Sequence, residues 1–520
     1  MSFSITLDAA QPPFVLAVDV GSTGTRAGLY DATGLPIKGL RNKIPHAFTT
    51  VANGTSTIDP DQVVHEIREV IGAVLDGIPA SSPGHAGGAT AGAGVAATSR
   101  AGVAPTGIAG VALDTFASSL VGVDAQNNAI TPCYTYADSR TAPQVNYLKS
   151  ILHEDDTQQR TGTRQHTGYL PARFLWLQQT QPDTFARVRH WMSLGEYAWL
   201  RIIGTTAAGT STAAWTGMLN RWEGTWDREL CELVGVDVEQ LSPIAHPSQP
   251  LTPADDVAAT WPLLADAAWF APISDGHSQS IGTGLTDSSQ MVLSAATSGA
   301  LRVLVDGDVE NLPRGLWCNR IDETRSILGG ALNDVGRAVT WLETTLRLPE
   351  QEVIEEMLRG EPTPGVPLVL PWFSGERSTG WVGEARAVFS RVNAATTPLE
   401  FYRGTMEGVA LSYVRMLRDL VLVTGSPREI LGTGRVSLEI PGLMQIIADA
   451  AESPVIPVTI KRSTLHGTAL HALEILAPDV ERAPVDRGET FQPTRERALY
   501  YHRKMERFQV LYDKVVAHGN

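Results

Sequence analysis

Short apolar runs alternate along this chain with amphipathic segments of helical period. Residues 14–20 read FVLAVDV, which predicts a buried strand, and RAGLYD after the turn GSTGT predicts a second strand paired with it. Residues 59–75 place apolar side chains on one helical face, with Asp59 as the expected cap and Pro60 in the first turn. The N-terminal pattern is therefore strand, tight glycine turn, strand and then helix.

The same strand–turn–strand pattern recurs in the second half of the chain. Residues 291–295 predict a strand, Thr297-Ser298-Gly299 a small-residue turn, and LRVLV a returning strand. This repetition favours two domains of related fold that face one another. Further strands are predicted at 108–113 and 119–123, and helices at 172–179, 194–203, 337–348, 399–423, 443–451, 465–476 and 495–516. Alternation of this kind is typical of an α/β protein.

Length and composition support this organisation. A chain of 520 residues is too long for one core, so two large domains are expected. Residues 79–107 differ from the rest, since they are rich in Ala, Gly, Ser and Pro and have almost no charge. We interpret them as a surface insertion or flexible loop.

Charge and cysteine content exclude several classes of function. With 43% hydrophobic and 19% charged residues the composition is that of a globular enzyme, and the net charge of −15 argues against general nucleic-acid binding. Cys133, Cys231 and Cys318 lie far apart and form no metal-binding or disulfide spacing. Neither a signal peptide nor an apolar run of membrane-spanning length is apparent, so we predict a cytoplasmic protein without a membrane partner.

The first segment that suggests chemistry is Asp19-Val20-Gly21-Ser22-Thr23-Gly24-Thr25-Arg26. A tight turn between two strands presents backbone N–H groups and hydroxyls in a concave array that binds phosphate. An acidic residue at the strand end can hold a hydrated Mg²⁺. The alternative is an ordinary hairpin with a solvated Asp, and the segment is not a Walker A loop because GxxxxGK[ST] is missing.

The second segment is Ser274-Asp275-Gly276. An Asp in a glycine-flanked loop can approach a ligand closely, and its carboxylate could accept a hydroxyl proton during phosphoryl transfer. The alternative is a structural Asx turn. We interpret the adjacent His277 as a structural or rim residue.

Three more glycine-containing turns could contact a nucleotide. Thr297-Ser298-Gly299 is a second candidate phosphate turn, and Gly336, after GGALN, opens a predicted helix where the backbone can approach a nucleotide closely. The third turn contains Gly432 and Gly434 and could surround an adenine or ribose. Each turn is weak evidence alone, and their order along the chain carries the argument.

In this order the motifs resemble the FGGY family of carbohydrate kinases. The resemblance spans nearly the whole chain and is most specific in AVDVGSTGTRAGLYD, TGYLPARFLWL, TGMLNRWEGTWDRELCELVGV, SDG…GTG, ATSGALRV, GGALNDVGRAVTWL and LPWFSGERSTGWVGEARAVF. It implies two actin-like ATPase domains, of the ribonuclease H-like type, with the active site in the cleft between them. The expected bounds are 14–285 for the sugar-binding domain and 286–516 for the nucleotide-binding domain.

The resemblance also implies roles for individual residues. Asp275 matches the catalytic base, and Asp19 matches the acidic residue near Mg²⁺ and the phosphates. The expected ATP- and phosphate-binding positions are Gly21, Ser22, Thr23, Arg26, Thr297, Ser298, Gly336, Thr340, Gly432 and Gly434. The expected substrate positions are Ala117, Ser118, Asp275 and Gly276. ATP and Mg²⁺ are the implied cofactors.

The sugar pocket departs from the family pattern. Members close to gluconate and xylulose kinases, which this chain resembles most, usually carry Met-His where it has Ala117-Ser118. A small hydroxyl in place of an imidazole removes a donor and opens space, so the substrate does not transfer from the family. A sugar carboxylate would require a basic partner, for which Arg140 and Arg173 are candidates. Gluconate, xylulose and other short sugars or polyols stay open.

Two other readings of the chain belong to different classes. One is a sugar-binding sensor or scaffold that has kept the fold without the chemistry, and the other is an actin-like ATPase that acts on protein partners. The intact set of Asp19, Asp275 and two phosphate turns argues against the first, and a base-bearing SDG loop argues against the second. A homodimer is left open.

Overall fold

The computed structural model of the chain describes residues 3–79, 108–363 and 365–517. Apart from Pro79, the predicted insertion at 79–107 lies outside these residues. Helices and strands alternate throughout, so the α/β class is confirmed. Within the described residues, no helix combines the length and the apolar character needed to cross a membrane. Cys133, Cys231 and Cys318 are buried and free.

A six-stranded sheet forms the centre of the first half of the chain. Its strand order is β12-β6-β1-β2-β3, and β13 also pairs with β6. The strands are β1 (Val15–Gly21), β2 (Gly24–Tyr30), β3 (Pro36–Ile44), β6 (Gly110–Thr115), β12 (Ala268–Trp269) and β13 (Ile273–Ser274). Strand β1 runs antiparallel to β2 and parallel to β6. The predicted N-terminal hairpin is confirmed.

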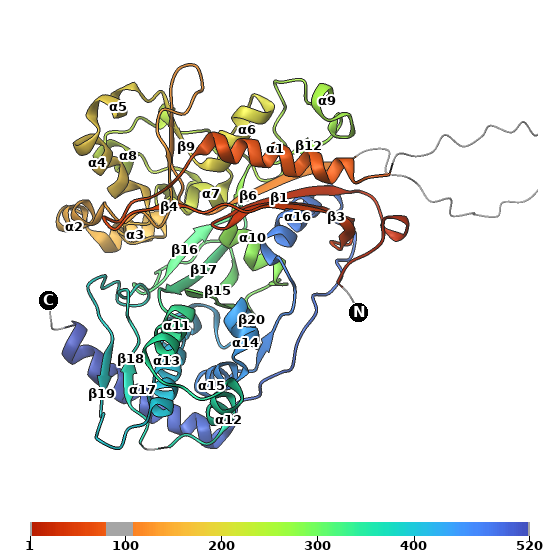
Figure 1. Cartoon of the computed structure of the whole chain (residues 1–520). Helices are drawn as coiled ribbons and strands as arrows, with labels where there is room; N and C mark the ends of the chain where they lie inside the picture. The colour runs from red at the N-terminus through yellow and green to blue at the C-terminus, as the bar shows by residue number, and fades with distance from the viewer. Residues whose placement is uncertain (1–2, 80–107, 364, 518–520) are drawn as a thin grey trace, which may run out of the picture.

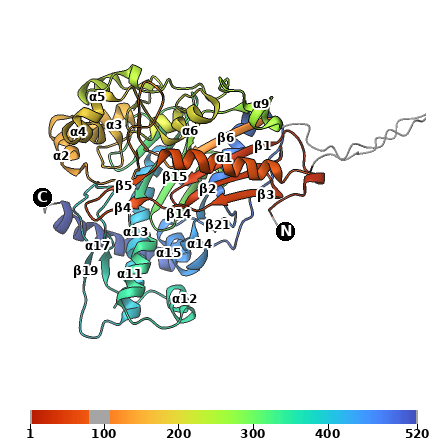
Figure 2. The same ribbon diagram turned by 45° about the horizontal axis from the view of Figure 1, so that its top comes forward.

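Helices cover both faces of this sheet, and the alternation of side chains along β1 decides which residues meet which helix. Leu16, Val18 and Val20 share a buried cluster with α1 (Pro60–Asp76), whose N-cap is Asp59 as predicted. Val15 and Ala17 pack on the other side against α16 (Ser463–Leu476). Figures 1 and 2 show α1 across one face, and Figure 1 shows the blue α16 beside β1 and β6. By the same alternation, Asp19 lies on the α16 face.

The second half of the chain repeats this arrangement. Its sheet has the order β16-β17-β15-β14-β20-β21, with β14 antiparallel to β15 and parallel to β20. The strands are β14 (Gln290–Ala295), β15 (Gly299–Asp306), β16 (Trp317–Arg320), β17 (Arg325–Leu332), β20 (Glu429–Thr433) and β21 (Val455–Pro457). The recurrence of the strand–turn–strand unit is therefore confirmed.

The remaining helices pack around these two sheets. Those of the first half are α2 (Ala142–Ile151), α3 (Glu154–Thr161), α4 (Leu170–Thr180), α5 (Pro182–Arg187), α6 (Leu194–Ile203), α7 (Thr210–Ala214), α8 (Arg228–Leu233), α9 (Val257–Thr260) and α10 (Asp275–Gly282). Those of the second half are α11 (Gly336–Thr345), α12 (Gln351–Arg359), α13 (Pro398–Thr424), α14 (Arg435–Glu439), α15 (Pro441–Ala451) and α17 (Arg495–Tyr512).

Short strands complete the structure: β4 (Thr49–Thr50) and β8 (Cys133–Tyr134) flank β5 (Ser56–Ile58), β7 (Val121–Val123) pairs with β9 (His190–Met192), β10 (Leu219–Asn220) with β11 (Thr225–Trp226), and β18 (Leu368–Leu370) with β19 (Val388–Ser390). Most predicted elements agree with these bounds to within a few residues at each end.

Two helices from distant parts of the chain cross in close contact behind the first sheet. A Cβ on Gly282 of α10 would lie 1.8 Å from the Ser463 carbonyl oxygen, and one on Gly467 of α16 would lie 1.8 Å from that of Ser278. Only glycine lets the two backbones approach this closely. The crossing holds α10, which begins at Asp275, against a helix that the chain adds nearly 200 residues later. The division at residues 285 and 286 stays a proposal, although α16, which follows it in the chain, packs on the first sheet.

Substitution of Gly467 tests this crossing. We expect Gly467→Ala to lower the free energy of unfolding by about 1–3 kcal/mol, because the new methyl group forces the two backbones apart. Urea unfolding followed by circular dichroism measures the change. Gly72→Ala is the matched control, since Gly72 lies within α1 and has no atom within 4 Å of an added Cβ; it should stabilise the helix by up to about 1 kcal/mol. Equal midpoints for both variants would contradict this account.

Candidate active site

Two carboxylates lie side by side where β1 and β6 end. Asp19 of β1 and Asp114 of β6 are register partners in the parallel pair, so their side chains share one face of the sheet. Both are buried, and α16 covers this face. Asp114 was not among the predicted residues, although an acid inside the apolar strand VALDT was a usable signal. The pair is a concentration of negative charge that needs compensation.

Hydroxyl and guanidinium donors compensate this charge in part. An Asp19 oxygen accepts hydrogen bonds from Arg26 Nη1 at 2.9 Å and from Thr464 Oγ1 at 3.4 Å. An Asp114 oxygen accepts one from Thr468 Oγ1 at 2.5 Å. Burial nevertheless raises the pKa of Asp19, against the lowering effect of Arg26. Burial, and then the Asp19 carboxylate, raise the pKa of Asp114 well above its ordinary value.

The second Asp114 oxygen is buried without a hydrogen-bond partner. A bare buried carboxylate oxygen is costly, so it is expected to take up a proton or a cation. Within the described residues no group of three or more His, Cys, Asp or Glu side chains is arranged to hold a metal ion. A divalent cation here would therefore depend on Asp19, Asp114 and oxygens of a ligand, which suits Mg²⁺.

Asp275 is the first residue of α10 rather than part of a glycine-flanked loop, so the predicted loop is wrong. Ser274 caps the helix by accepting the His277 backbone N–H at 3.3 Å, which starts a helix where only a turn was expected. The Ala117 N–H donates to Asp275 Oδ1 at 3.3 Å. Adjacent Gly276 leaves room for Trp215, whose ring would lie 2.9 Å from an added Cβ.

The protonated form of Asp275 is favoured more strongly in the protein than it would be in water. Burial raises the pKa of Asp275 to about 6, while the Arg302 charge and the Ala117 N–H lower it and the Asp19 carboxylate raises it. Arg302 lies on β15 of the second sheet. Asp275 therefore lies where groups from both sheets act on it.

Tyr136 was also missing from the predicted set. Burial and then the Asp275 charge raise the pKa of its phenol, and Ser22 hydrogen-bonds to it. It therefore lies between the first turn and Asp275, although 45% of its surface is exposed. No local motif marks it, because its position depends on how the segment after β8 folds over the sheet.

The first candidate phosphate turn is a two-residue hairpin between the paired residues Gly21 and Gly24. Ser22 and Thr23 are exposed, and Arg26 Nη2 donates to Thr23 Oγ1 at 3.5 Å. Gly24 has φ +148°, and an added Cβ would lie 2.5 Å from the Ile44 carbonyl oxygen. The turn is thus exposed on one side and packed tightly on the other.

The second candidate turn lies against the predicted nucleotide positions. The Thr297 carbonyl accepts the backbone N–H groups of Val335 at 3.2 Å and Arg337 at 3.1 Å, which joins the turn to the start of α11. Added Cβ atoms on Gly336 and Gly434 would lie 2.6 Å from the Ala296 oxygen and 2.4 Å from the Ala295 oxygen.

The predicted nucleotide residues therefore gather around the end of β14. These are Thr297, Ser298, Gly336, Thr340, Gly432 and Gly434, with Thr340 exposed one turn into α11 and Gly432 at the end of β20. Gly329 and Gly330 instead lie inside β17, away from any helix start.

The predicted substrate positions Ala117 and Ser118 follow β6. Ser118 has φ 57°, and its hydroxyl donates to the Trp215 carbonyl. Its own carbonyl accepts from Arg173 Nη1 at 3.0 Å. The Ser118 hydroxyl is therefore already engaged within the protein.

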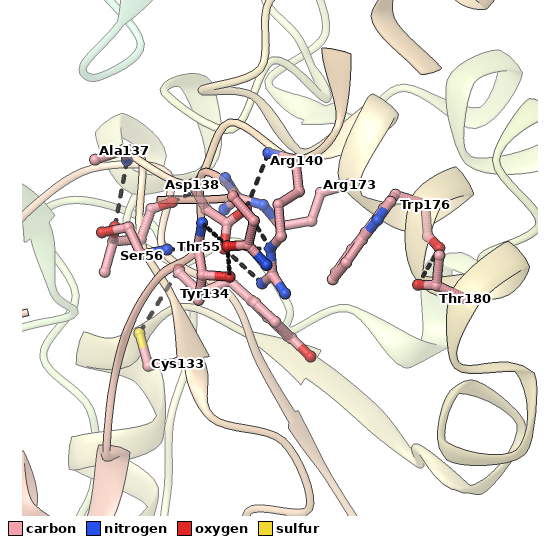
Figure 3. A network of polar contacts seen from close by, with 12 residues as sticks. Thr55, Ser56, Cys133, Tyr134, Ala137, Asp138, Arg140, Arg173, Trp176 and Thr180 are labelled. Atoms are coloured by element: carbon pink, nitrogen blue, oxygen red, sulfur yellow. Dashed lines mark hydrogen bonds and ion pairs between the residues drawn. The ribbon is translucent and has the colours of Figure 1, made fainter. Parts of the chain in front are cut away.

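Both arginines considered for a sugar carboxylate have partners in the protein (Figure 3). Arg140 Nη2 lies 2.6 Å from Asp138 Oδ2, and the Arg140 guanidinium lies 4.2 Å from the centre of the Trp176 ring. Arg173 is fully buried and also donates to the Thr135 carbonyl at 2.8 Å. Arg173 thereby links the Ser118 segment with the Thr135 segment.

Comparison with known proteins agrees with the motifs. The N-terminal domain profile of the FGGY family of carbohydrate kinases matches residues 14–261, and the C-terminal domain profile matches residues 291–474. A gluconokinase of Bacillus licheniformis is 21% identical over 95% of this chain and 94% of its own.

Solved structures agree with the fold. A gluconate kinase from Lactobacillus acidophilus superposes with a TM-score of 0.85 at 22% identity, covering 97% of this chain and 98% of that one. A ligand-bound xylulose kinase from the same species gives a TM-score of 0.86 at 23% identity, covering 97% and 99%. The predicted pair of actin-like ATPase domains is confirmed.

The raised pKa of Asp275 predicts a stability effect. An unfolded chain releases this proton near the ordinary pKa of 3.8, and the folded protein near 6, so the contribution of Asp275 to stability falls as pH rises through this window. We expect Asp275→Asn to be more stable than the wild type by about 1–3 kcal/mol at pH 7.5 and about equal to it near pH 4. Urea unfolding at both pH values measures this. A stability difference that does not change with pH would contradict the assignment.

Proposed function

Given that this chain belongs to the FGGY family of carbohydrate kinases and uses ATP to phosphorylate a carbohydrate, we propose that Asp275 is the general base of the transfer. The observation that carries the proposal is the position of Asp275 at the N-terminus of α10, with the Ala117 N–H orienting its carboxylate and Arg302 of the other sheet acting on it. A base whose pKa is about 6 is ionised at neutral pH and still basic enough to accept a hydroxyl proton.

The step conserves atoms and charge. The substrate O–H bond breaks and its proton passes to the Asp275 carboxylate, while the oxygen forms a bond to the γ-phosphorus of ATP. The bond between that phosphorus and the β,γ-bridging oxygen breaks, and ADP leaves. Positioning and charge stabilisation dominate such transfers, so the groups around Asp275 act mainly by placement.

The phosphate chain requires donors and a cation. We assign the first turn, with Gly21, Ser22, Thr23 and Arg26, and the second turn, with Thr297 and Ser298, to the phosphates. Gly336, Thr340, Gly432 and Gly434 would accommodate the adenosine. Asp19, with Asp114 beside it, would hold Mg²⁺ through one or two carboxylates and phosphate oxygens, and the cation would neutralise charge on the phosphates.

For the acceptor we propose a neutral ketose or polyol ahead of an aldonate. The named relatives include gluconokinases and xylulose kinases, so both remain in the comparison. Arg140 and Arg173, the two candidates for binding a sugar carboxylate, are occupied by Asp138 and by backbone carbonyls. Trp215 and Tyr136 next to Asp275 offer ring surfaces suited to the apolar face of a sugar.

A screen of ADP release across pentuloses, polyols, aldonates and short-chain sugars tests the acceptor. We expect the highest kcat/KM with a neutral ketose or polyol, because no free guanidinium was found at the two candidate positions. A clear preference for an aldonate would overturn the acceptor assignment. Sugar binding without ADP release would favour a sensor or scaffold, and ATP turnover indifferent to every sugar would favour an ATPase that acts on a protein.

Substitution of the base tests the mechanism. We expect Asp275→Asn to lower kcat by about 10²–10⁴-fold while ATP binding, followed by calorimetry, stays near normal. For the wild type, kcat/KM should fall as pH drops below about 6, since the protonated acid cannot accept a proton. Asp287→Asn is the matched control, because Asp287 is exposed just after the same helix. Near-normal sugar phosphorylation by Asp275→Asn would exclude this role.

A further inference from the structure

A buried histidine lies directly behind the first phosphate turn. His46 follows β3, and its side chain is fully buried. Its Nδ1 lies 2.7 Å from Glu66 Oε2, and its Nε2 lies 2.8 Å from the Gly21 carbonyl oxygen. The ring thus connects helix α1, which carries Glu66, with the turn that follows β1.

The partners of His46 determine where its protons lie. A carbonyl oxygen only accepts hydrogen bonds, so Nε2 must carry a hydrogen. Glu66 also accepts from Thr25 Oγ1 at 2.6 Å and from Gln62 Nε2 at 2.8 Å. The carboxyl group that holds the ring is therefore itself fixed by side chains of β2 and α1.

His46 hydrogen-bonds to two carbonyl groups of the turn. Its side chain binds the Gly21 carbonyl, and its backbone N–H donates to the Thr23 carbonyl at 3.4 Å. In a planar trans peptide the N–H points opposite to the C=O. The N–H group of Ser22, which shares its peptide with the Gly21 carbonyl, is therefore directed away from the His46 ring.

We propose that His46, held by Glu66, is a positioning residue for the phosphates of ATP: it fixes the Gly21–Gly24 turn so that its N–H groups are presented to them. The proposal rests on the proposed function, which assigns this turn to the phosphates. The tight contact of Gly24 with the Ile44 carbonyl holds the His46 segment against the turn.

Calorimetry with MgATP and with adenosine separates positioning from general damage. We expect His46→Gln to weaken MgATP binding about tenfold, since the hydrogen bonds of the ring to Glu66 and to the Gly21 carbonyl are lost, and to leave adenosine binding unchanged because adenosine has no phosphates. His65→Gln is the matched control, because the His65 side chain is 80% exposed on the same helix as Glu66. It should change neither affinity.

Glu66→Gln provides a second variant in case His46→Gln does not fold. Without the carboxylate the ring loses the partner that fixes its orientation, so MgATP binding should weaken about threefold to tenfold with adenosine binding retained. Unchanged MgATP affinity in a folded variant, or an equal loss for MgATP and adenosine, would overturn the positioning role. Failure of the wild type itself to bind MgATP would instead refute the proposed function.

Discussion

The close crossing of α10 and α16 is the contact on which the site depends. Gly282 and Gly467 bring two backbones together, and α16 also packs on β1 and β6. As a result one helix carries Asp275 at its first residue, while the other supplies Thr464 and Thr468 to the buried acids of the sheet. A side chain larger than glycine at the crossing would separate Asp275 from the buried acids of the sheet. The site is thus assembled by packing rather than by a single continuous motif.

Concentrating acidic residues in this position costs stability. Burial raises the pKa of Asp19, Asp114 and Asp275, so their charged forms are disfavoured in the absence of a ligand. Arg26, the two threonines and the Ala117 N–H offset only part of that cost. Such unfavourable electrostatics is characteristic of sites that bind a cation or move a proton, and less characteristic of structural cores. The loss of stability caused by burying acidic groups is therefore concentrated in these three side chains.

The two turns that we propose for the phosphates illustrate how one local pattern serves both halves. Each joins antiparallel strands next to a parallel partner, and each is braced from behind. The second is tied by backbone hydrogen bonds to the start of α11, whereas the first is held by the side chain and backbone of His46. The two turns therefore share the same strand arrangement but are held in place by different contacts.

Local pattern alone determined a large part of this protein: the α/β class, the repeated strand–turn–strand unit, most helices and the two glycine turns. These follow from periodicity and turn chemistry, which act over a few residues. Tertiary structure alone decided that Asp275 begins a helix, that Asp114 lies beside Asp19, that Arg140 and Arg173 are engaged, and that His46 lies behind Gly21. Each depends on residues far apart in sequence meeting in space, because burial and hydrogen-bond partners are set by packing and not by neighbours along the chain.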